Sequence, residues 1–286
     1  MPNASSPVLS EWELQEIDRA NTSALTPVVF VHGLWLLSSS WQRWRDLFEA
    51  NGYTTLAPGW PDEPTSVEAA RKAPNVLANK TVKQTTDHYL AAIARLGRKP
   101  AVIGHSFGGL IAQKIAGVGA SAVTVAIDNA PFKGVLPLPV SALKSASPVL
   151  LNPANRGKAI TLTLEQFSFG WANNLDAAET AALYDEYHVA AAGAPLFQAA
   201  FANVNFFGGE TRVDSTTPKR GPLLIIAGDN DNTVPLALTK ATFRLQSRNP
   251  GVTELTTLSD RGHSLVIDHG WQEVANTALA FVKRFV

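Results

Sequence analysis

Residues 100–118 read Pro-Ala-Val-Ile-Gly-His-Ser-Phe-Gly-Gly-Leu-Ile-Ala-Gln-Lys-Ile-Ala-Gly-Val, and this stretch decides the fold. The apolar run at 101–103 is typical of a short strand, and Leu110, Ile111 and Ile115 recur at the spacing of one helix face. Between them, residues 104–108 match the pattern G-x-S-x-G. That pattern predicts a serine whose hydroxyl is exposed on a sharp turn from a strand into a helix.

The glycines of this pattern have a steric reason. A serine in a strained backbone conformation brings the residues two before and two after it together, and only glycine lacks the Cβ that would clash. The helix that follows directs free N–H groups and the positive end of its dipole at the serine, which suits a developing oxyanion. The alternative is an ordinary glycine-rich turn, since the bare pattern arises by chance about 0.1 times in a chain of this length.

Composition narrows the class of protein. The chain has 286 residues, of which 45% are hydrophobic, and a formal net charge of zero. These values favour a well-packed domain without a nucleic-acid partner. Cysteine is absent, which excludes disulfides and thiolate metal ligands. Without an apolar leader or a membrane-length apolar run, we expect a cytoplasmic protein with no membrane span.

Predicted strands and helices alternate along most of the chain. The proline-rich stretch 58–79 is predicted to be a loop. Alternation of this kind predicts a mostly parallel central sheet flanked by helices. The expected strands are 27–31, 53–57, 101–103, 122–127, 223–227 and 252–258. The expected helices are 38–50, 81–96, the one after Ser106, 235–247 and 270–285, and residues 11–20 are expected to form either a short amphipathic turn of helix or a lead-in arm.

Residues 132–217 interrupt this alternation. They contain three predicted helices, at 162–170, 176–191 and 195–203, and many aromatic residues. Asp176 and Glu179 are spaced as in a capping box. We therefore expect a core formed by residues 1–131 and 218–286 and a helical lid formed by the insertion.

A serine hydroxyl needs a base within hydrogen-bond reach to act as a nucleophile. His263 is the preferred candidate, because it lies in a loop directly after the predicted strand 252–258, at the end of the strands where parallel sheets bind ligands. His269 lies near a helix start, where a structural role is simpler. Packing or loop-shaping roles are expected for the other four histidines, which are His32, His88, His105 and His188.

The third member of such a site is a carboxylate that orients the imidazole. The strand 223–227 leads into a turn with two aspartates, of which Asp231 is preferred and Asp229 is second. Either one could instead serve only to shape the turn. Asp128, at the end of the preceding strand, is a weaker third candidate.

Nearly the whole chain resembles the α/β-hydrolase fold family, in particular its serine carboxylesterase and lipase-like branch with a helical cap. The order Ser106, Asp231, His263 is that of the family's catalytic triad. Gly228 and Pro235 flank Asp231 as in the family's acid-bearing turn. The family's first pair of strands is not evident before Pro27, so we expect the sheet to be shortened at that edge. The resemblance also implies an oxyanion hole built from the backbone N–H groups of two residues, Leu34 and Phe107.

The resemblance implies a serine hydrolase that cleaves carboxylic esters or a lactone through an acyl-enzyme, without a metal or an organic cofactor. Its partner would be a small-molecule ester of medium size, apolar or aromatic, held by Trp35, Phe132 and Val234. The loop at 32–35, with Trp41, resembles that of methylesterases and hydroxynitrile lyases, but Ser264 stands where those lyases commonly have a lysine. The alternatives are a C–C hydrolase, a perhydrolase, a lyase, or a small-molecule receptor with a vestigial triad. The oligomeric state is left open.

Overall fold

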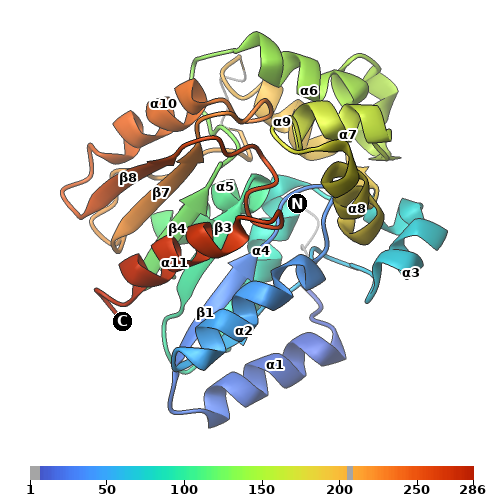
Figure 1. Ribbon diagram of the computed structural model, residues 1–286. Coiled ribbons are helices and arrows are strands. Elements are labelled where there is room, and N and C mark those ends of the chain that lie inside the picture. Colours follow the sequence, from blue (N-terminus) through green and yellow to red (C-terminus); the bar gives the residue numbers. More distant parts are fainter. Residues whose placement is uncertain (1–6, 205–208) are drawn as a thin grey trace, which may run out of the picture.

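The computed structural model describes residues 7–204 and 209–286, and its core is a single parallel sheet (Figure 1). Within these residues, six strands lie in the order β2-β1-β3-β4-β7-β8, and every neighbouring pair is parallel. The predicted parallel sheet is therefore confirmed. The strands are β1 (Thr26–Val31), β2 (Tyr53–Leu56), β3 (Ala101–His105), β4 (Val123–Ile127), β7 (Leu223–Gly228) and β8 (Thr253–Leu258).

Strand composition follows position in the sheet. The central strands β3, β4 and β7 are buried along their whole length, as expected of parallel strands covered on both faces. The edge strand β8, which reads Thr-Glu-Leu-Thr-Thr-Leu, is mostly half-buried. At the opposite edge the chain before β1 forms helix α1 (Glu11–Thr22), which packs against β2. Within the described residues no strand lies beyond β2, so the sheet is shortened at that edge, as expected.

Helices cover both faces of the sheet. In Figure 1, α2 (Gln42–Ala50) and α11 (Trp271–Val282) lie in front of the strands, and α4 (Val82–Ile93) and α5 (Phe107–Gly117) lie behind them. Helix α10 (Leu236–Gln246) packs on β7 and β8. An aromatic cluster joins β1 to the segment of α2: the rings of Phe30 and Trp41 stack at 5.1 Å, and Trp44 meets Trp41 edge-on at 5.0 Å. Large buried rings of this kind supply much of the apolar burial that holds such a layer together.

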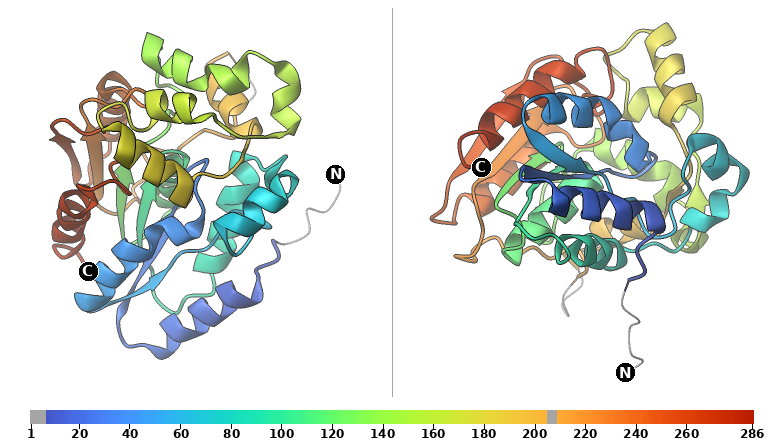
Figure 2. Two further views of the ribbon diagram at one scale, coloured as in Figure 1. Left: turned by 45° about the vertical axis from the view of Figure 1, so that its right-hand side comes forward. Right: turned by 90° about the horizontal axis from the view of Figure 1, so that it is seen from below.

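The chain between β4 and β7 forms an insertion of helices, residues 132–217, with residues 205–208 outside the described part. Its helices are α6 (Val140–Leu150), α7 (Leu164–Gly170), α8 (Ala177–Tyr187) and α9 (Ala194–Ala200), and two short strands, β5 (Ala159–Ile160) and β6 (Ala191–Ala192), pair antiparallel. Both views of Figure 2 show this insertion, coloured green to gold, gathered over one end of the sheet. Whether the insertion opens as a lid stays a prediction.

Several predicted boundaries were wrong. The stretch 58–79 is not all loop, because it contains α3 (Val67–Lys72) and a 3-10 helix, η2 (Pro74–Leu77). Ser66 caps α3 by accepting the Ala69 N–H at 3.1 Å, and Pro74 ends it and starts η2. Residues 38–50 form a 3-10 helix, η1 (Ser38–Trp41), followed by α2. Helix α6 was missed, since Pro148 lies inside it.

The predicted capping box at α8 is only half present. Asp176 accepts the Glu179 N–H at 2.8 Å, as an N-cap should. The Glu179 carboxylate, however, accepts the backbone N–H of His269 at 2.7 Å instead of returning to the cap. It also pairs with the His269 ring at 2.8 Å, which gives that histidine a surface structural role. No helix in the described part of the chain is long and apolar enough to span a bilayer.

Candidate active site

Ser106 occupies the turn between β3 and α5 in a strained conformation, with φ 56° and ψ −122°. The two flanking glycines are in direct contact: a Cβ added to Gly104 would lie 2.1 Å from the Gly108 carbonyl oxygen. A Cβ on Gly108 would lie 2.0 Å from the carbonyl oxygen of Val31. Larger residues would therefore push the turn apart, which is the steric reason expected from the pattern. The turn aims the serine side chain past the carboxyl end of β3.

Three side chains from separate loops meet at this end of the sheet. The His263 ring follows β8, and its Nε2 lies 3.0 Å from Ser106 Oγ. On the other side of the ring, Nδ1 lies 2.6 Å from Oδ2 of Asp231, which follows β7. All three residues are buried, Ser106 at 5% exposure and His263 at zero. The arrangement is that of a nucleophile, a general base and an orienting acid in one hydrogen-bonded line.

The turn around Asp231 holds its carboxylate in place. Oδ1 accepts the backbone N–H groups of Thr233 at 2.6 Å and Val234 at 2.8 Å. Oδ2 remains for the imidazole, and a carboxylate there requires the ring to carry its proton on Nδ1. Nε2 is then free to accept the Ser106 proton.

The competing aspartates have other partners. Asp229 is exposed, and its carboxylate accepts the backbone N–H of Asp260 at 2.7 Å, a turn-shaping role. Asp128 is fully buried and accepts the Gly228 N–H through Oδ1 at 2.9 Å, while its Oδ2 has no hydrogen-bond partner in the described structure. Burial, reinforced by the negative charge of Asp231, raises the pKa of the Asp128 carboxyl well above its usual value. Burial therefore favours the protonated form of Asp128, which lies beside Asp231 and His263.

Asp128, Asp231 and His263 place their ligand atoms within 4.8 Å of one another, the sole such group of three within residues 7–204 and 209–286. His263 Nδ1 and Asp231 Oδ2 are already hydrogen-bonded to each other, and all three residues are buried. A metal ion would have to break the hydrogen bond that orients the imidazole. The donor set therefore does not fit a resident metal.

The raised pKa of Asp128 predicts a stabilising substitution. The folded chain keeps a proton that the unfolded chain releases above about pH 4, so the free energy of unfolding falls as pH rises through that window. Asparagine is neutral at every pH and can keep the Gly228 contact. We expect Asp128→Asn to unfold at a higher temperature than wild type at pH 8, with the difference shrinking toward pH 4. Thermal unfolding across that range measures it, and a pH-independent difference would contradict the assignment.

The two expected oxyanion-hole donors, the backbone N–H groups of Leu34 and Phe107, come from segments next to Ser106. In the described part of the chain, neither the Leu34 N–H nor the Phe107 N–H donates to a protein acceptor. Phe107 is the first residue of α5, directly after the nucleophile. The loop bearing Leu34 reaches the same place, since a Cβ on Gly33 would lie 2.7 Å from the Ser106 Cβ. Unpaired N–H groups beside a serine are the arrangement that stabilises an oxyanion.

The three residues predicted to hold substrate are all buried, but they differ in their surroundings. Trp35 links the loop to the insertion: its indole N–H donates to the Ile160 carbonyl at 3.0 Å, and its own carbonyl accepts the Val189 N–H at 3.1 Å. Val234 lies in the acid-bearing turn. Phe132 lies where the chain leaves β4 for the insertion. Contact of these residues with a substrate stays a prediction.

Trp171, at the end of α7, was not predicted to be a site residue. Its ring meets the His263 ring edge-on at 4.7 Å, and its carbonyl accepts the Ser264 N–H at 3.0 Å. Trp171 thereby packs against the candidate base from the insertion side. It lies 92 positions before His263 in the chain (263 minus 171), so only the density of aromatics in the insertion hinted at it.

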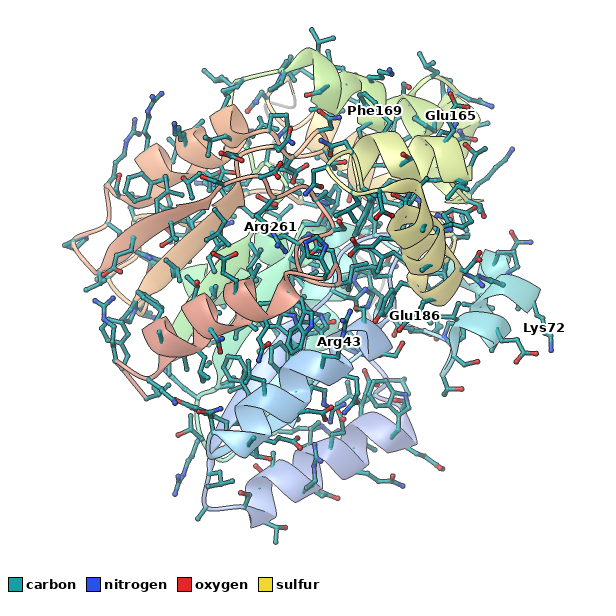
Figure 3. All side chains as sticks on the ribbon, in the orientation of Figure 1. Arg43, Lys72, Glu165, Phe169, Glu186 and Arg261 are labelled. Atoms are coloured by element: carbon teal, nitrogen blue, oxygen red, sulfur yellow. The ribbon has the colours of Figure 1, made fainter. Side chains whose placement is uncertain are left out.

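A second contact between the insertion and the base-bearing loop runs through Arg43 of α2 (Figure 3). Its guanidinium donates to the Tyr187 hydroxyl at 3.1 Å and also to the Ile267 carbonyl. Arg261, labelled in the same figure, pairs with buried Asp268 inside the loop that carries His263. These contacts fix the loop from two sides and hold the imidazole in its orientation.

The remaining histidines have packing roles, as expected. The His105 ring is buried 4.6 Å from that of His263, and burial lowers the pKa of His105 well below its usual value, so it stays neutral. His88 contacts Glu13 at 2.7 Å. Burial, followed by the charge of Arg71, lowers the pKa of His188 to about 4.

A parallel sheet with this serine turn, acid turn and histidine loop in chain order defines the α/β-hydrolase fold. The chain belongs to the Alpha/beta hydrolase family, whose sequence pattern matches residues 28–277. No curated protein matches the sequence significantly.

Solved structures show the same fold. A monoacylglycerol lipase from Paleococcus ferrophilus superposes with a TM-score of 0.65 at 19% identity, over 91% of this chain and 95% of the lipase. A thermophilic esterase from Thermogutta terrifontis gives a TM-score of 0.64 at 16% identity, over 91% of this chain and 90% of the esterase. Polyneuridine aldehyde esterase gives 0.62 at 17% identity, over 90% and 99%. The similarity of this chain to hydrolases is thus one of fold.

Proposed function

We propose that this protein is a serine hydrolase of carboxylic esters, with Ser106 as the nucleophile, His263 as the base and Asp231 as the acid. The observation that carries the proposal is the continuous line from Ser106 Oγ to His263 Nε2 at 3.0 Å and from His263 Nδ1 to Asp231 at 2.6 Å. The esterases and the lipase with the same fold support the reaction class.

The proposed reaction proceeds in two halves. Ser106 Oγ attacks the ester carbonyl while its proton passes to His263 Nε2, and Asp231 stabilises the resulting imidazolium. The oxyanion of the tetrahedral intermediate accepts from the N–H groups of Leu34 and Phe107. His263 then gives its proton to the leaving alcohol, which breaks the ester C–O bond. Water, activated by the same imidazole, hydrolyses the acyl-enzyme and restores the serine.

The proposed substrate is a medium-sized apolar or aromatic ester, or a lactone. Support comes from a cavity beside the oxyanion loop, where Leu34 and Trp35 face the alanines at 190–192 of the insertion. Its remaining lining is His32, Gly33, Leu36, Trp60, Glu63, Leu77 and Lys80. Apolar walls with a few polar groups favour neutral substrates over charged ones.

A substrate panel tests the proposal. We expect aryl esters of medium acyl length to give higher kcat/KM than esters of short, charged acids, by about 10-fold or more, because each buried methylene contributes roughly 0.8 kcal/mol. Hydrolysis rates on a panel of aryl esters, with neutral acyl chains of rising length and with short, charged acids, provide the measurement. β-Diketones and acetate with peroxide serve as controls for C–C hydrolysis and perhydrolysis. Preference for the charged esters would contradict the substrate class, and turnover of the control substrates alone would contradict ester hydrolysis.

A further inference from the structure

A buried histidine and glutamate lie behind the oxyanion loop and take no part in the proposed proton transfers. His32 directly follows β1 and opens that loop, and Glu63 comes from the loop between β2 and α3. Both side chains are 3% exposed. His32 Nε2 lies 2.7 Å from Glu63 Oε2, and His32 Nδ1 lies 2.8 Å from the Gly33 carbonyl oxygen. The ring therefore stands between a carboxylate and a backbone carbonyl.

The two ring nitrogens have different neighbours: Nδ1 is hydrogen-bonded to a backbone carbonyl, and Nε2 lies within ion-pair distance of a carboxylate. A carbonyl oxygen can only accept, which puts a proton on His32 Nδ1. The Glu63 carboxylate is already an acceptor on both oxygens, from the backbone N–H of Ser38 at 2.7 Å and of Trp60 at 3.2 Å. Burial favours the neutral acid, but the His32 charge and the Ser38 N–H outweigh it and hold the pKa of Glu63 below its usual value. Glu63 therefore faces the His32 ring as a carboxylate.

The contact with Gly33 determines where the next N–H points. The Gly33 carbonyl and the Leu34 N–H belong to one planar trans peptide, in which the C=O and N–H bonds point in opposite directions. A ring that holds the carbonyl on its own side turns the N–H to the other side. There Gly33 lies against Ser106, and the Leu34 N–H has no acceptor among residues 7–204 and 209–286.

We propose that the His32–Glu63 pair is a positioning device that aims the Leu34 N–H at the oxyanion. Glu63 holds the ring, the ring holds the Gly33 carbonyl, and the peptide presents its N–H to the reacting carbonyl oxygen. Both side chains act on the reaction through the Gly33 peptide, and neither contacts the reacting atoms. A second tether supports the loop, because the Trp60 indole N–H donates to the His32 carbonyl at 3.2 Å. This inference rests on the proposed ester hydrolysis.

Two substitutions at residue 32 separate the two contacts of the ring. Asparagine places an amide N–H near the position of Nδ1, so His32→Asn can keep the Gly33 contact while losing Glu63. Glutamine places one near Nε2, so His32→Gln can keep the Glu63 contact while losing Gly33. We expect His32→Gln to lower kcat by about 10- to 100-fold with KM within about threefold, because a misaimed oxyanion donor weakens the transition state alone. His32→Asn is expected to keep a kcat at least about fivefold above that of His32→Gln.

A trifluoromethyl ketone provides the second measurement, because its tetrahedral adduct carries an oxyanion. Inhibition by this ketone should weaken for His32→Gln by about the same factor as kcat, and should weaken less for His32→Asn. If His32→Gln does not fold, Glu63→Gln replaces it, since it removes the charge that holds the ring and should lower kcat without raising KM. The matched control is His88→Gln, which breaks the buried His88–Glu13 pair away from the site and should reduce stability only.

The outcomes distinguish this inference from the proposed function. If Ser106→Ala abolishes turnover while His32→Gln matches wild type, the inference fails and the esterase proposal survives. If His32→Asn and His32→Gln lose kcat equally, the Gly33 contact is not what positions the donor, and the inference also fails. If Ser106→Ala retains turnover, the proposed function falls and takes the inference with it.

Discussion

Replacing Ser106 with alanine is expected to reduce kcat for ester hydrolysis by about 10⁶-fold while leaving the protein folded. The reason is chemical: alanine has no oxygen to attack the carbonyl, and His263 then has no proton to accept. The turn should keep its shape, because the backbone and both glycines stay as they are. Residual catalysis should come only from the oxyanion donors and substrate binding.

Fluorophosphonate labelling provides the direct measurement. The probe should modify wild type at Ser106, located by peptide mapping, and should leave Ser106→Ala unmodified. Circular dichroism and the unfolding temperature of the variant serve as the control for folding. Turnover of the alanine variant above about 1% of wild type would assign the nucleophile to another residue.

Replacing Asp231 with asparagine is expected to lower kcat by about 10⁴-fold. Oδ1 of an asparagine can still accept the N–H groups of Thr233 and Val234, so the turn should keep its shape. In the wild type, Oδ2 of Asp231 lies 2.6 Å from His263 Nδ1. Asparagine would place an NH₂ donor at that position, facing the same ring nitrogen. The imidazole would then carry its proton on Nε2 and could no longer accept one from Ser106.

The matched control for this substitution lies two residues away. Asp229 is exposed and accepts the Asp260 N–H through a single oxygen, a contact that asparagine can also make. We expect Asp229→Asn to change kcat by less than about twofold. Steady-state kinetics of the two variants on one aryl ester provide the comparison. Equal losses in both variants would mean that the turn as a whole, and not the Asp231 carboxylate, is required.

Local sequence was informative wherever the chain's own sterics or periodicity determine the structure. The turn at 104–108 could be predicted because only glycine tolerates the 2.1 Å approach at Gly104. The buried central strands were recognisable as continuous apolar runs. Helix α6 and the helices within 58–79 were missed because prolines there look like breaks, although Pro74 starts a helix and Pro148 lies inside one.

The site itself was predicted in part. Chain order and loop position indicated His263, and the two aspartates of one turn were left as alternatives. Trp171 carried no signal as a neighbour of the base, because it reaches His263 from a helix of the insertion. The pairing of His32 with Glu63 was equally invisible, since the two are 31 positions apart (63 minus 32) and belong to different loops.

By itself, the sequence determined the serine turn, the parallel sheet and the order of the reactive residues. These depend on forces within a few residues, namely backbone sterics, apolar periodicity and helix-end dipoles. Only the tertiary structure decided that Asp231 faces the imidazole, that Asp128 lies buried beside it with a raised pKa, and that a buried histidine and glutamate lie behind the Leu34 peptide. Such contacts form between loops that the sheet brings together at the carboxyl ends of its strands. Their chemistry depends on how deeply the side chains are buried, which a local stretch of sequence does not determine.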